Sequence, residues 1–196
     1  MLATLATVKS RLAILPTDLT YDSLLTSAIK AISTRFDRET NRTLARTVGF
    51  IQEFDADATD LVLACYPLES VSRFEVKSSE AAGWLEQTAT DFIIRNNCVI
   101  SLGSPLRAPN SASSIARVTY TGGYVLPGTT SAPGQTPLPD DLEQAAVEQL
   151  AYWFQKKEHL GLRIYWPSGD AYRQFVELDL LAGVTATLTR YRRWTL

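Results

Sequence analysis

The chain reads Ala116-Arg117-Val118-Thr119-Tyr120-Thr121-Gly122-Gly123-Tyr124 where its strand pattern is clearest. Here Val118 and Tyr120 alternate with polar neighbours, which is the period-two pattern of a half-buried strand. Gly122 and Gly123 allow backbone conformations with positive φ that side chains resist. The strand is therefore predicted to end in a tight turn.

An amphipathic helix is predicted to begin soon afterwards, at Leu138-Pro139-Asp140-Asp141. Asp140 or Asp141 can cap the free N–H groups of its first turn, and Pro139 is tolerated because no intrahelical N–H is needed there. Eight residues share one face by helical spacing, and most of them are apolar: Leu142, Ala145, Ala146, Gln149, Leu150, Trp153, Phe154 and Lys157. Such a face is typical of a helix packed against a core.

Two further helices are predicted before the strands, and one at the end of the chain. The first runs from Leu5 to Leu12, with Thr4 as its cap and Pro16 beyond its end. The second covers residues 22–42, and its apolar side chains share one face: Leu25, Ala28, Ile29, Ile32 and Phe36. The last helix starts at residue 178 or 181 and ends at residue 191.

Between residues 43 and 121 the periodicity is that of strands. The candidate strands are rich in β-branched and aromatic residues: Thr47–Phe54, Leu61–Cys65, Ser70–Lys77, Phe92–Arg95, Cys98–Ser101 and Ile115–Thr121. Asn96-Asn97 predicts a two-residue hairpin, because Asn tolerates the left-handed backbone region. Residues 129–137 are polar and contain Gly134 and two prolines, which indicates a flexible loop.

These patterns predict an α+β fold that is mainly helical, in one domain covering residues 1–196. About four helices form a small bundle, and an antiparallel β module is inserted between the second and third helices. The helical body takes residues 1–42 and 138–196, the β module takes residues 43–125, and residues 126–137 form the flexible loop.

The composition is that of a folded protein, and its charge balance limits the classes of partner that it can bind. With 19 basic and 21 acidic residues the net charge is −2, which argues against a protein whose main task is gripping nucleic acid, although one local basic patch is allowed. Cys65 and Cys98 lack Cys-x-x-Cys spacing and are expected to be small buried hydrophobes. No secretory signal or membrane span is expected, so synthesis in a cytoplasm is predicted.

No catalytic or metal-binding pattern is present in the sequence. His159 is the only histidine, without a second ligand at metal spacing, and its expected role is at a helix C-terminus. Residues 55–60 superficially resemble a calcium loop but lack its Gly and late Glu, so a solvated hairpin turn is favoured. Gly122-Gly123 is not followed by the Lys of a phosphate loop. We therefore predict no enzyme, no cofactor and no metal.

The C-terminal segment combines basic and aromatic residues: Arg190, Tyr191, Arg192, Arg193 and Trp194. It can be a solvated tail, or it can anchor a protein interface, where Arg, Tyr and Trp dominate the binding energy. Arginines also form bidentate pairs with carboxylates. We favour the interface, with nucleic acid as the rival partner. The β module offers a second kind of contact, because edge strands can pair between subunits.

The order of these motifs resembles one family of viral assembly proteins. The motifs are a strand ending in Tyr-Thr-Gly-Gly-Tyr (residues 120–124), a Pro/Gly loop, Leu-Pro-Asp-Asp-Leu (138–142), Ala-Tyr-Trp-Phe (151–154), the two N-terminal helices and the Pro-centred link Tyr66-Pro67-Leu68-Glu69-Ser70-Val71. In this order they resemble the head–tail connector (adaptor) proteins of long-tailed double-stranded DNA bacteriophages and of gene transfer agents.

The resemblance implies a structural role in a virion. Connector subunits form a homo-oligomeric ring of about twelve copies between the portal and the stopper or other tail-side neck proteins. Double-stranded DNA passes through the ring without sequence recognition. The resemblance also implies that the C-terminal segment docks onto the portal, with no membrane involved and with synthesis in the host cytoplasm.

Three other functions are compatible with the residues. One is another neck or tail-completion protein, a stopper or terminator. A second is a small-ligand or enzymatic α+β domain with a pocket near Trp84, Tyr120 and Tyr124. A third is a DNA-binding module that uses the C-terminal arginines, which predicts affinity that falls steeply with salt.

Overall fold

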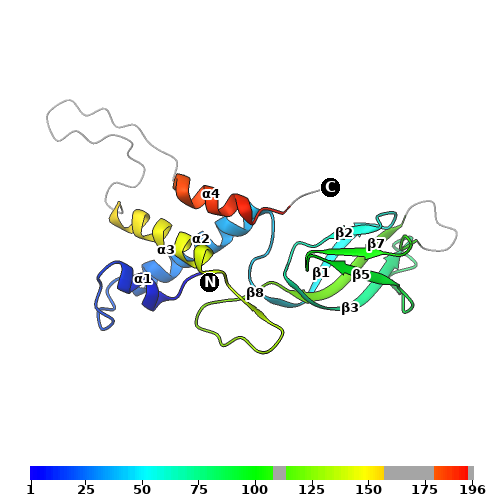
Figure 1. Cartoon of the computed structure of the whole chain (residues 1–196), viewed down its shortest axis with the longest axis horizontal. Coiled ribbons are helices and arrows are strands. Elements are labelled where there is room, and N and C mark those ends of the chain that lie inside the picture. The colour runs from blue at the N-terminus through cyan, green and yellow to red at the C-terminus, as the bar shows by residue number, and fades with distance from the viewer. Residues whose placement is uncertain (108–113, 157–178, 194–196) are drawn as a thin grey trace, which may run out of the picture. The chain divides into compact units, whose positions relative to one another are not determined.

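The computed structural model describes residues 1–107, 114–156 and 179–193, and it divides the chain into two compact units (Figure 1). The helical unit contains Met1–Glu39 and Leu138–Tyr191. The β unit contains Thr40–Pro137 and Arg192–Leu196. The predicted α+β class is confirmed, but the description as mainly helical is not supported, since strands and helices share the described residues almost equally.

The helical unit is built from four helices within the described part of the chain: α1 (Leu5–Arg11), α2 (Asp22–Thr40, whose last residue belongs to the β unit), α3 (Asp140–Gln155) and α4 (Ala182–Arg190). The predicted cap of α1 is confirmed, because the Thr4 hydroxyl accepts the Thr7 N–H at 3.1 Å. The buried ammonium of Lys9 lies 2.5 Å from the Asp22 carboxylate, which joins α1 to the start of α2.

Apolar side chains at helical spacing form the interior of this unit. They come from three helices: Leu25, Ile29, Ile32 and Phe36 of α2, Leu142, Ala146 and Leu150 of α3, and Val184 and Leu188 of α4. Tyr21 and Phe154 meet edge to face with ring centroids 5.2 Å apart. The fully buried Gln149 accepts the Leu181 N–H at 2.8 Å, so this polar member of the predicted face of α3 orders the start of α4.

The start of α3 differs from the prediction. The N-cap residue is Pro139, and neither Asp140 nor Asp141 caps the helix with its side chain. Asp141 instead accepts a hydrogen bond of 2.6 Å from the Tyr191 hydroxyl. Both carboxylates still lie in the first turn, where negative charge suits the helix dipole.

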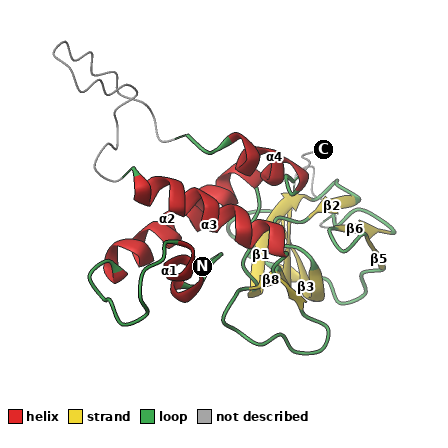
Figure 2. Cartoon of the chain, turned by 60° about the vertical axis from the view of Figure 1, so that its left-hand side comes forward, coloured by secondary structure: helices red, strands yellow, loops and turns green. Residues whose placement is uncertain are grey.

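The β unit consists of two antiparallel sheets and one short parallel pair, with the strands in yellow in Figure 2. The first sheet has the order β1 (Thr47–Asp55), β7 (Ile115–Gly122), β3 (Leu68–Lys77), β4 (Leu85–Glu86). The second has the order β2 (Asp60–Val62), β6 (Val99–Leu102), β5 (Phe92–Arg95). One continuous core takes buried side chains from both sheets, among them Leu61, Phe74, Ile100, Val118 and Tyr120.

Five of the six predicted strands are present with end shifts of at most two residues, whereas the predicted strand Leu61–Cys65 is the shorter β2, which ends at Val62. Asn96 and Asn97 adopt φ values of 50° and 53°, so the predicted hairpin turn between β5 and β6 is confirmed. Three short strands were not predicted: β4, and the parallel pair β8 (Tyr124–Val125) and β9 (Thr136–Pro137). The pair β8–β9 closes the loop that the sequence presents as flexible.

The double glycine occupies a crowded backbone position of the β unit. A Cβ at Gly122 would lie 2.5 Å from the Cys65 carbonyl oxygen, and one at Gly123 would lie 2.7 Å from the Ala45 carbonyl oxygen. Gly123 also has a φ of +96°. The glycines are therefore required because other backbone segments approach them closely, and at Gly123 also for its φ.

The structure cannot be compared with the predicted role of His159, and it gives one finding on membrane spans. His159 and Lys157 belong to the part of the chain that is not described. None of the described helices is long and apolar enough to cross a membrane.

Candidate interaction surfaces

The residues of the predicted interface segment, Arg190 to Trp194, differ in exposure and in their contacts. Arg190 ends α4 and is exposed, and Arg192 is exposed as well. Neither guanidinium makes an ion pair or hydrogen bond with a described residue. Tyr191 is half-buried and donates its hydroxyl to Asp141, so it has a structural role in the helical unit.

The end of the segment belongs to the β unit. The Arg193 N–H donates to the Thr40 carbonyl at 2.8 Å, and the Arg193 Nε is buried without a partner among the described residues. Trp194 lies outside the described residues. The structure thus leaves two arginines, Arg190 and Arg192, available to a partner.

A buried arginine stands where the chain enters the β unit. Arg42 is only 4% exposed, and its guanidinium carbon lies 3.3 Å from the centre of the Tyr66 ring and 5.2 Å from that of Tyr124. It also donates to the Tyr66 carbonyl. Burial raises the pKa of the Tyr66 hydroxyl. These contacts hold the Tyr66-Pro67 link against the residues that follow α2, so we assign Arg42 a structural role.

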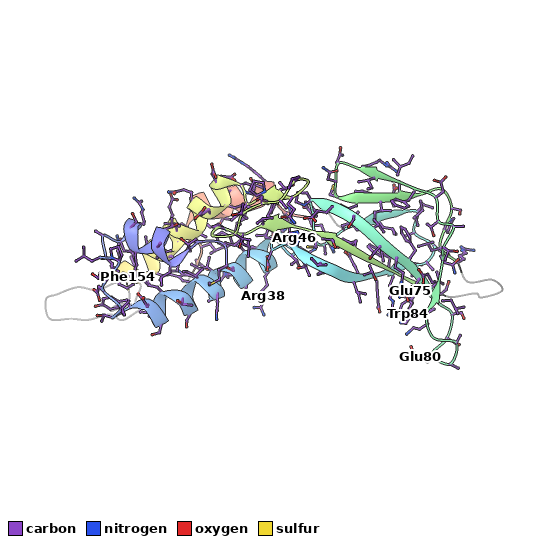
Figure 3. All side chains as sticks on the ribbon, turned by 90° about the horizontal axis from the view of Figure 1, so that it is seen from below. Arg38, Arg46, Glu75, Glu80, Trp84 and Phe154 are labelled. Carbon is purple, nitrogen blue, oxygen red and sulfur yellow. The ribbon has the colours of Figure 1, made fainter. Side chains whose placement is uncertain are left out.

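The outer face of the four-stranded sheet carries a cluster of paired charges. Arg117 binds Glu75 through two hydrogen bonds of 2.7 and 2.9 Å, which hold the pKa of the Glu75 carboxyl below its usual value. The Trp84 ring stacks on Arg117 and lies 5.0 Å from the Lys77 ammonium. Figure 3 shows Glu75 and Trp84 close together at one end of the ribbon. These charges neutralise one another within the subunit.

Sequence reasoning missed this cluster, although a signal for it exists. Glu75 and Arg117 are directly opposite in the β3–β7 register, and opposite charges at facing positions of two alternating strands are a recognisable pattern. The pattern becomes visible only once the pairing of β3 with β7 is known.

Two sheet edges carry exposed apolar side chains. β1 ends the four-stranded sheet and β5 ends the three-stranded sheet, and no described strand pairs with the outer side of either. Ile51 of β1 is 56% exposed and Ile93 of β5 is 68% exposed. Val48 of β1 and Ile94 of β5 are exposed as well. Natural edge strands usually carry charges or proline against unwanted pairing, and these two carry exposed isoleucines beside charged residues, so we treat them as candidate contact surfaces.

The residues proposed for a ligand pocket do not converge. Tyr120 is fully buried between the sheets, where its hydroxyl donates to Gln52 and accepts the N–H groups of Ala64 and Cys65. Trp84 instead stacks on the outer face of the same sheet. A cavity of about 370 Å³ lies in the helical unit and is lined by Arg11, Glu148, Ala151, Tyr152, Gln155 and Leu181. No three metal-ligating side chains of the described residues come together.

Solved structures of gene transfer agent particles contain chains that are similar to this one in fold. A chain in the neck of an empty gene transfer agent particle, computed with C6 symmetry, matches 100% of this chain and 91% of its own length with a TM-score of 0.60. The chain has the fold of a gene transfer agent neck subunit. The resemblance to the connector family is thereby confirmed at the level of the fold.

Two further matches come from the same kind of particle. A chain in the virion of a native gene transfer agent particle matches 100% of this chain and 91% of its own, with 16% identity and a TM-score of 0.56. A neck chain of a native particle, computed with C12 symmetry, has 21% identity, a TM-score of 0.49, and coverage of 97% of this chain and 88% of its own. Identity to the first chain is 17%. No family model and no curated protein matches the sequence.

Proposed function

We propose that this protein is a structural head–tail connector (adaptor) subunit of a phage-like particle. It forms an oligomeric ring between the portal and the tail-side neck proteins, and DNA passes through the channel of the ring. The observation that carries this proposal is the match of the whole chain to a neck subunit, with a TM-score of 0.60 over 100% of its residues. The similar neck chain was computed with C6 symmetry, which supports a ring.

The physics of such a ring requires contact surfaces and no chemistry. Subunits associate head to tail, and the ring closes when the repeated rotation completes a full circle. The described surface suits this task, because several exposed apolar side chains, among them Ile51 and Ile93, lie on sheet edges, while Glu75 and Arg117 on the outer face are paired within the subunit. The copy number of about twelve follows from the family resemblance alone and is part of the proposal.

The proposed portal contact is the segment from Arg190 to Trp194. Its support is that Arg190 and Arg192 are exposed and make no ion pair with described residues. Guanidinium groups in this state can form bidentate pairs with carboxylates of a partner. Tyr191 is a poor target for variants, since it also bonds to Asp141 within the subunit.

Native mass spectrometry of the full chain, alone and mixed with the portal from the same genome, tests the proposal. We expect a defined ring on the portal, and its mass counts the subunits. The variant Arg190→Glu/Arg192→Glu should lose this co-assembly. The control variant Lys30→Glu/Arg38→Glu makes the same charge change at exposed positions of α2 and should assemble normally.

Other outcomes would point elsewhere. A protein that ignores the portal but binds isolated tail-side proteins would be a stopper or terminator, and the adaptor role would be wrong. Tight binding to DNA that weakens steeply with salt and disappears in the Arg190→Glu/Arg192→Glu variant would assign the tail to nucleic acid.

A further inference from the structure

Two exposed cations of α2 lack the carboxylate partners that the cations between residues 43 and 125 have. The latter are all in ion pairs within the subunit: Arg46, Arg73, Lys77, Arg95, Arg107 and Arg117. Lys30 and Arg38 are exposed, and neither charged group makes an ion pair or hydrogen bond with a described residue. Figure 3 shows the Arg38 side chain pointing away from its helix. This positive charge is therefore available to an anionic partner.

These two cations belong to a polar stripe along the exposed face of α2. Its six residues are spaced by three or four positions, so they share one side of the helix, and all of them are exposed. The α2 stripe consists of Ser23, Ser27, Lys30, Ala31, Thr34 and Arg38. It contains no carboxylate and no aromatic ring.

The carboxylates of α2 are engaged elsewhere, so they do not neutralise the α2 stripe. Asp22 pairs with the buried Lys9, and Glu39 pairs with Arg35 one turn before it. Asp37 is half-buried and interacts electrostatically with the N-terminal ammonium of the chain. The stripe therefore carries two positive charges and no negative one.

We infer that the α2 stripe contacts the phosphate backbone of double-stranded DNA in the channel of the ring. This inference rests on the proposed connector function and names the surface that faces the DNA. Lys30 and Arg38 lie about 12 Å apart along the helix axis, so they can reach different phosphates. Ser23 and Ser27 add hydroxyl groups that make no hydrogen bond with a described residue, and such hydroxyls commonly donate to phosphate oxygens.

The composition of the α2 stripe favours DNA over a protein partner. The energy of a protein contact comes mainly from large, often aromatic, side chains buried at its centre, and this stripe offers only the methyl group of Ala31. Contacts to phosphate instead need cations and hydroxyls, which the stripe has, and they carry no sequence information.

The small number of cations also suits a duplex that moves past the subunit. Each subunit offers two cations in the α2 stripe, so it holds DNA weakly, and the ring repeats this weak contact around the duplex. Electrostatic contacts that ignore the base sequence allow proteins and DNA to slide along each other. The α2 stripe would thus guide the DNA without stopping it.

The salt dependence of DNA binding tests this contact. Fluorescence anisotropy of a short labelled duplex measures binding to portal-bound rings, with the portal alone as the blank. In the variant Lys30→Gln/Arg38→Gln the affinity in about 50 mM salt should fall at least about tenfold. The slope of log affinity against log salt should also become shallower, because each lost phosphate contact removes about 0.9 from it. Native mass spectrometry first shows that the variant rings are intact.

The matched control is Arg73→Gln/Arg107→Gln. It makes the same charge change at two arginines whose side chains are 52% and 62% exposed but already paired with carboxylates. This variant should keep the affinity and the salt slope of the wild type. An equal loss in both variants would show that only the net charge of the ring matters, and would overturn the inference.

Photocrosslinking locates the contact independently of its strength. In a Cys98→Ser background, which keeps the buried Cys65, a benzophenone is attached to Ser27→Cys on the α2 stripe. Light should link this position to DNA in the ring. The same label on Gln144→Cys, an exposed position of the acidic helix α3, should give no DNA adduct. Equal adducts from both positions would overturn the assignment to α2.

The outcomes separate this inference from the connector role. Portal-bound rings that bind DNA equally well with and without Lys30 and Arg38 would overturn the phosphate contact and leave the connector role intact. A wild-type chain that forms no ring with the portal would overturn the connector role, and this inference with it. A Lys30→Gln/Arg38→Gln variant that keeps DNA but loses a tail-side protein would assign the stripe to an acidic protein surface and also overturn the inference.

Discussion

The double-glycine turn and the sheet edges belong to the same β unit, but the turn is tightly packed and the edges are exposed to solvent. At Gly122 and Gly123 the backbone of two other segments, residues 65–67 and 45–46, leaves no room for a single added carbon. At Ile51 and Ile93 more than half of each side chain is open to solvent. The interior of the unit therefore determines whether the chain folds, and its edges are free to determine what the folded chain binds.

This contrast means that stability and assembly should respond to different substitutions. A change at the turn must distort backbone, whereas a change at an edge meets only water in the free subunit. The predictions below test whether the two regions are as separate as the contacts indicate.

The largest expected effect is at the turn. Gly122→Ala places a Cβ 2.5 Å from the Cys65 carbonyl oxygen, which is backbone and cannot rotate away. We expect the free energy of unfolding in urea to fall by about 3 kcal/mol or more. Gly183→Ala, whose Cβ meets nothing within 4 Å in helix α4, should leave stability unchanged or raise it by up to about 1 kcal/mol. Equal losses in both variants would contradict the crowding argument.

The next effect concerns the buried hydroxyl beside the turn. Tyr120→Phe removes a donor to Gln52 and an acceptor for the Cys65 N–H, and should cost about 2 kcal/mol. Burial raises the pKa of Tyr120 to about 12. The neutral hydroxyl thus stabilises the fold fully below the ordinary value of 10.0, and this contribution is lost as the pH rises through about 12.

The measurement is urea unfolding of the wild type and of Tyr120→Phe from pH 8 to pH 11. The stability difference between the two should shrink as the pH rises. A difference that stays constant with pH would mean that Tyr120 ionises at its usual pKa in the folded chain.

A smaller effect is expected on the outer face of the four-stranded sheet, whose residues are more exposed than the turn and less exposed than the edges. Glu75→Gln breaks the paired hydrogen bonds to Arg117 and should cost about 1 kcal/mol at neutral pH. Because the pKa of Glu75 is lowered, its contribution is present above the ordinary value of 4.5 and is lost as the pH falls below it. The difference in stability between the variant and the wild type should therefore narrow as the pH falls below 4.5, and a difference that does not narrow would contradict the pairing.

The smallest effect on stability, and the largest on assembly, is expected at the edges. Ile51→Ser and Ile93→Ser should each change the free energy of unfolding by less than about 0.5 kcal/mol, because their side chains are already in water. Ring formation on the portal, followed by native mass spectrometry, should weaken clearly in both. A large loss of stability would show that these side chains serve the core of the subunit.

The helices and strands could be predicted from the sequence because their signals are local. Thr4 caps α1, the alternation around Val118 and Tyr120 marks β7, and Asn96-Asn97 turns between β5 and β6. The Pro/Gly loop offered no such signal, since the pair β8–β9 depends on residues brought together across it.

The candidate surfaces were harder to predict because they depend on pairing between distant strands. Periodicity identifies Ile51 and Ile93 as strand residues, but only the sheet order shows that β1 and β5 are edges. The predicted cap of α3 was wrong for a related reason, since Asp141 bonds to Tyr191, a residue 50 positions away in the sequence. The role of Arg190 to Trp194 stays a prediction.

The strand order also has a consequence for synthesis of the protein on the ribosome. β1 ends at Asp55, but its partner β7 begins only at Ile115, so the two cannot pair until a further 60 or so residues have been made. At about 5–20 residues per second this delay is about 3–12 s. During it, β1 has neither edge paired, and Phe50 and Phe54 lack the core against which they pack in the folded unit. In a cell that makes many copies at once, nascent chains with this segment are natural clients for chaperones that bind extended apolar sequences.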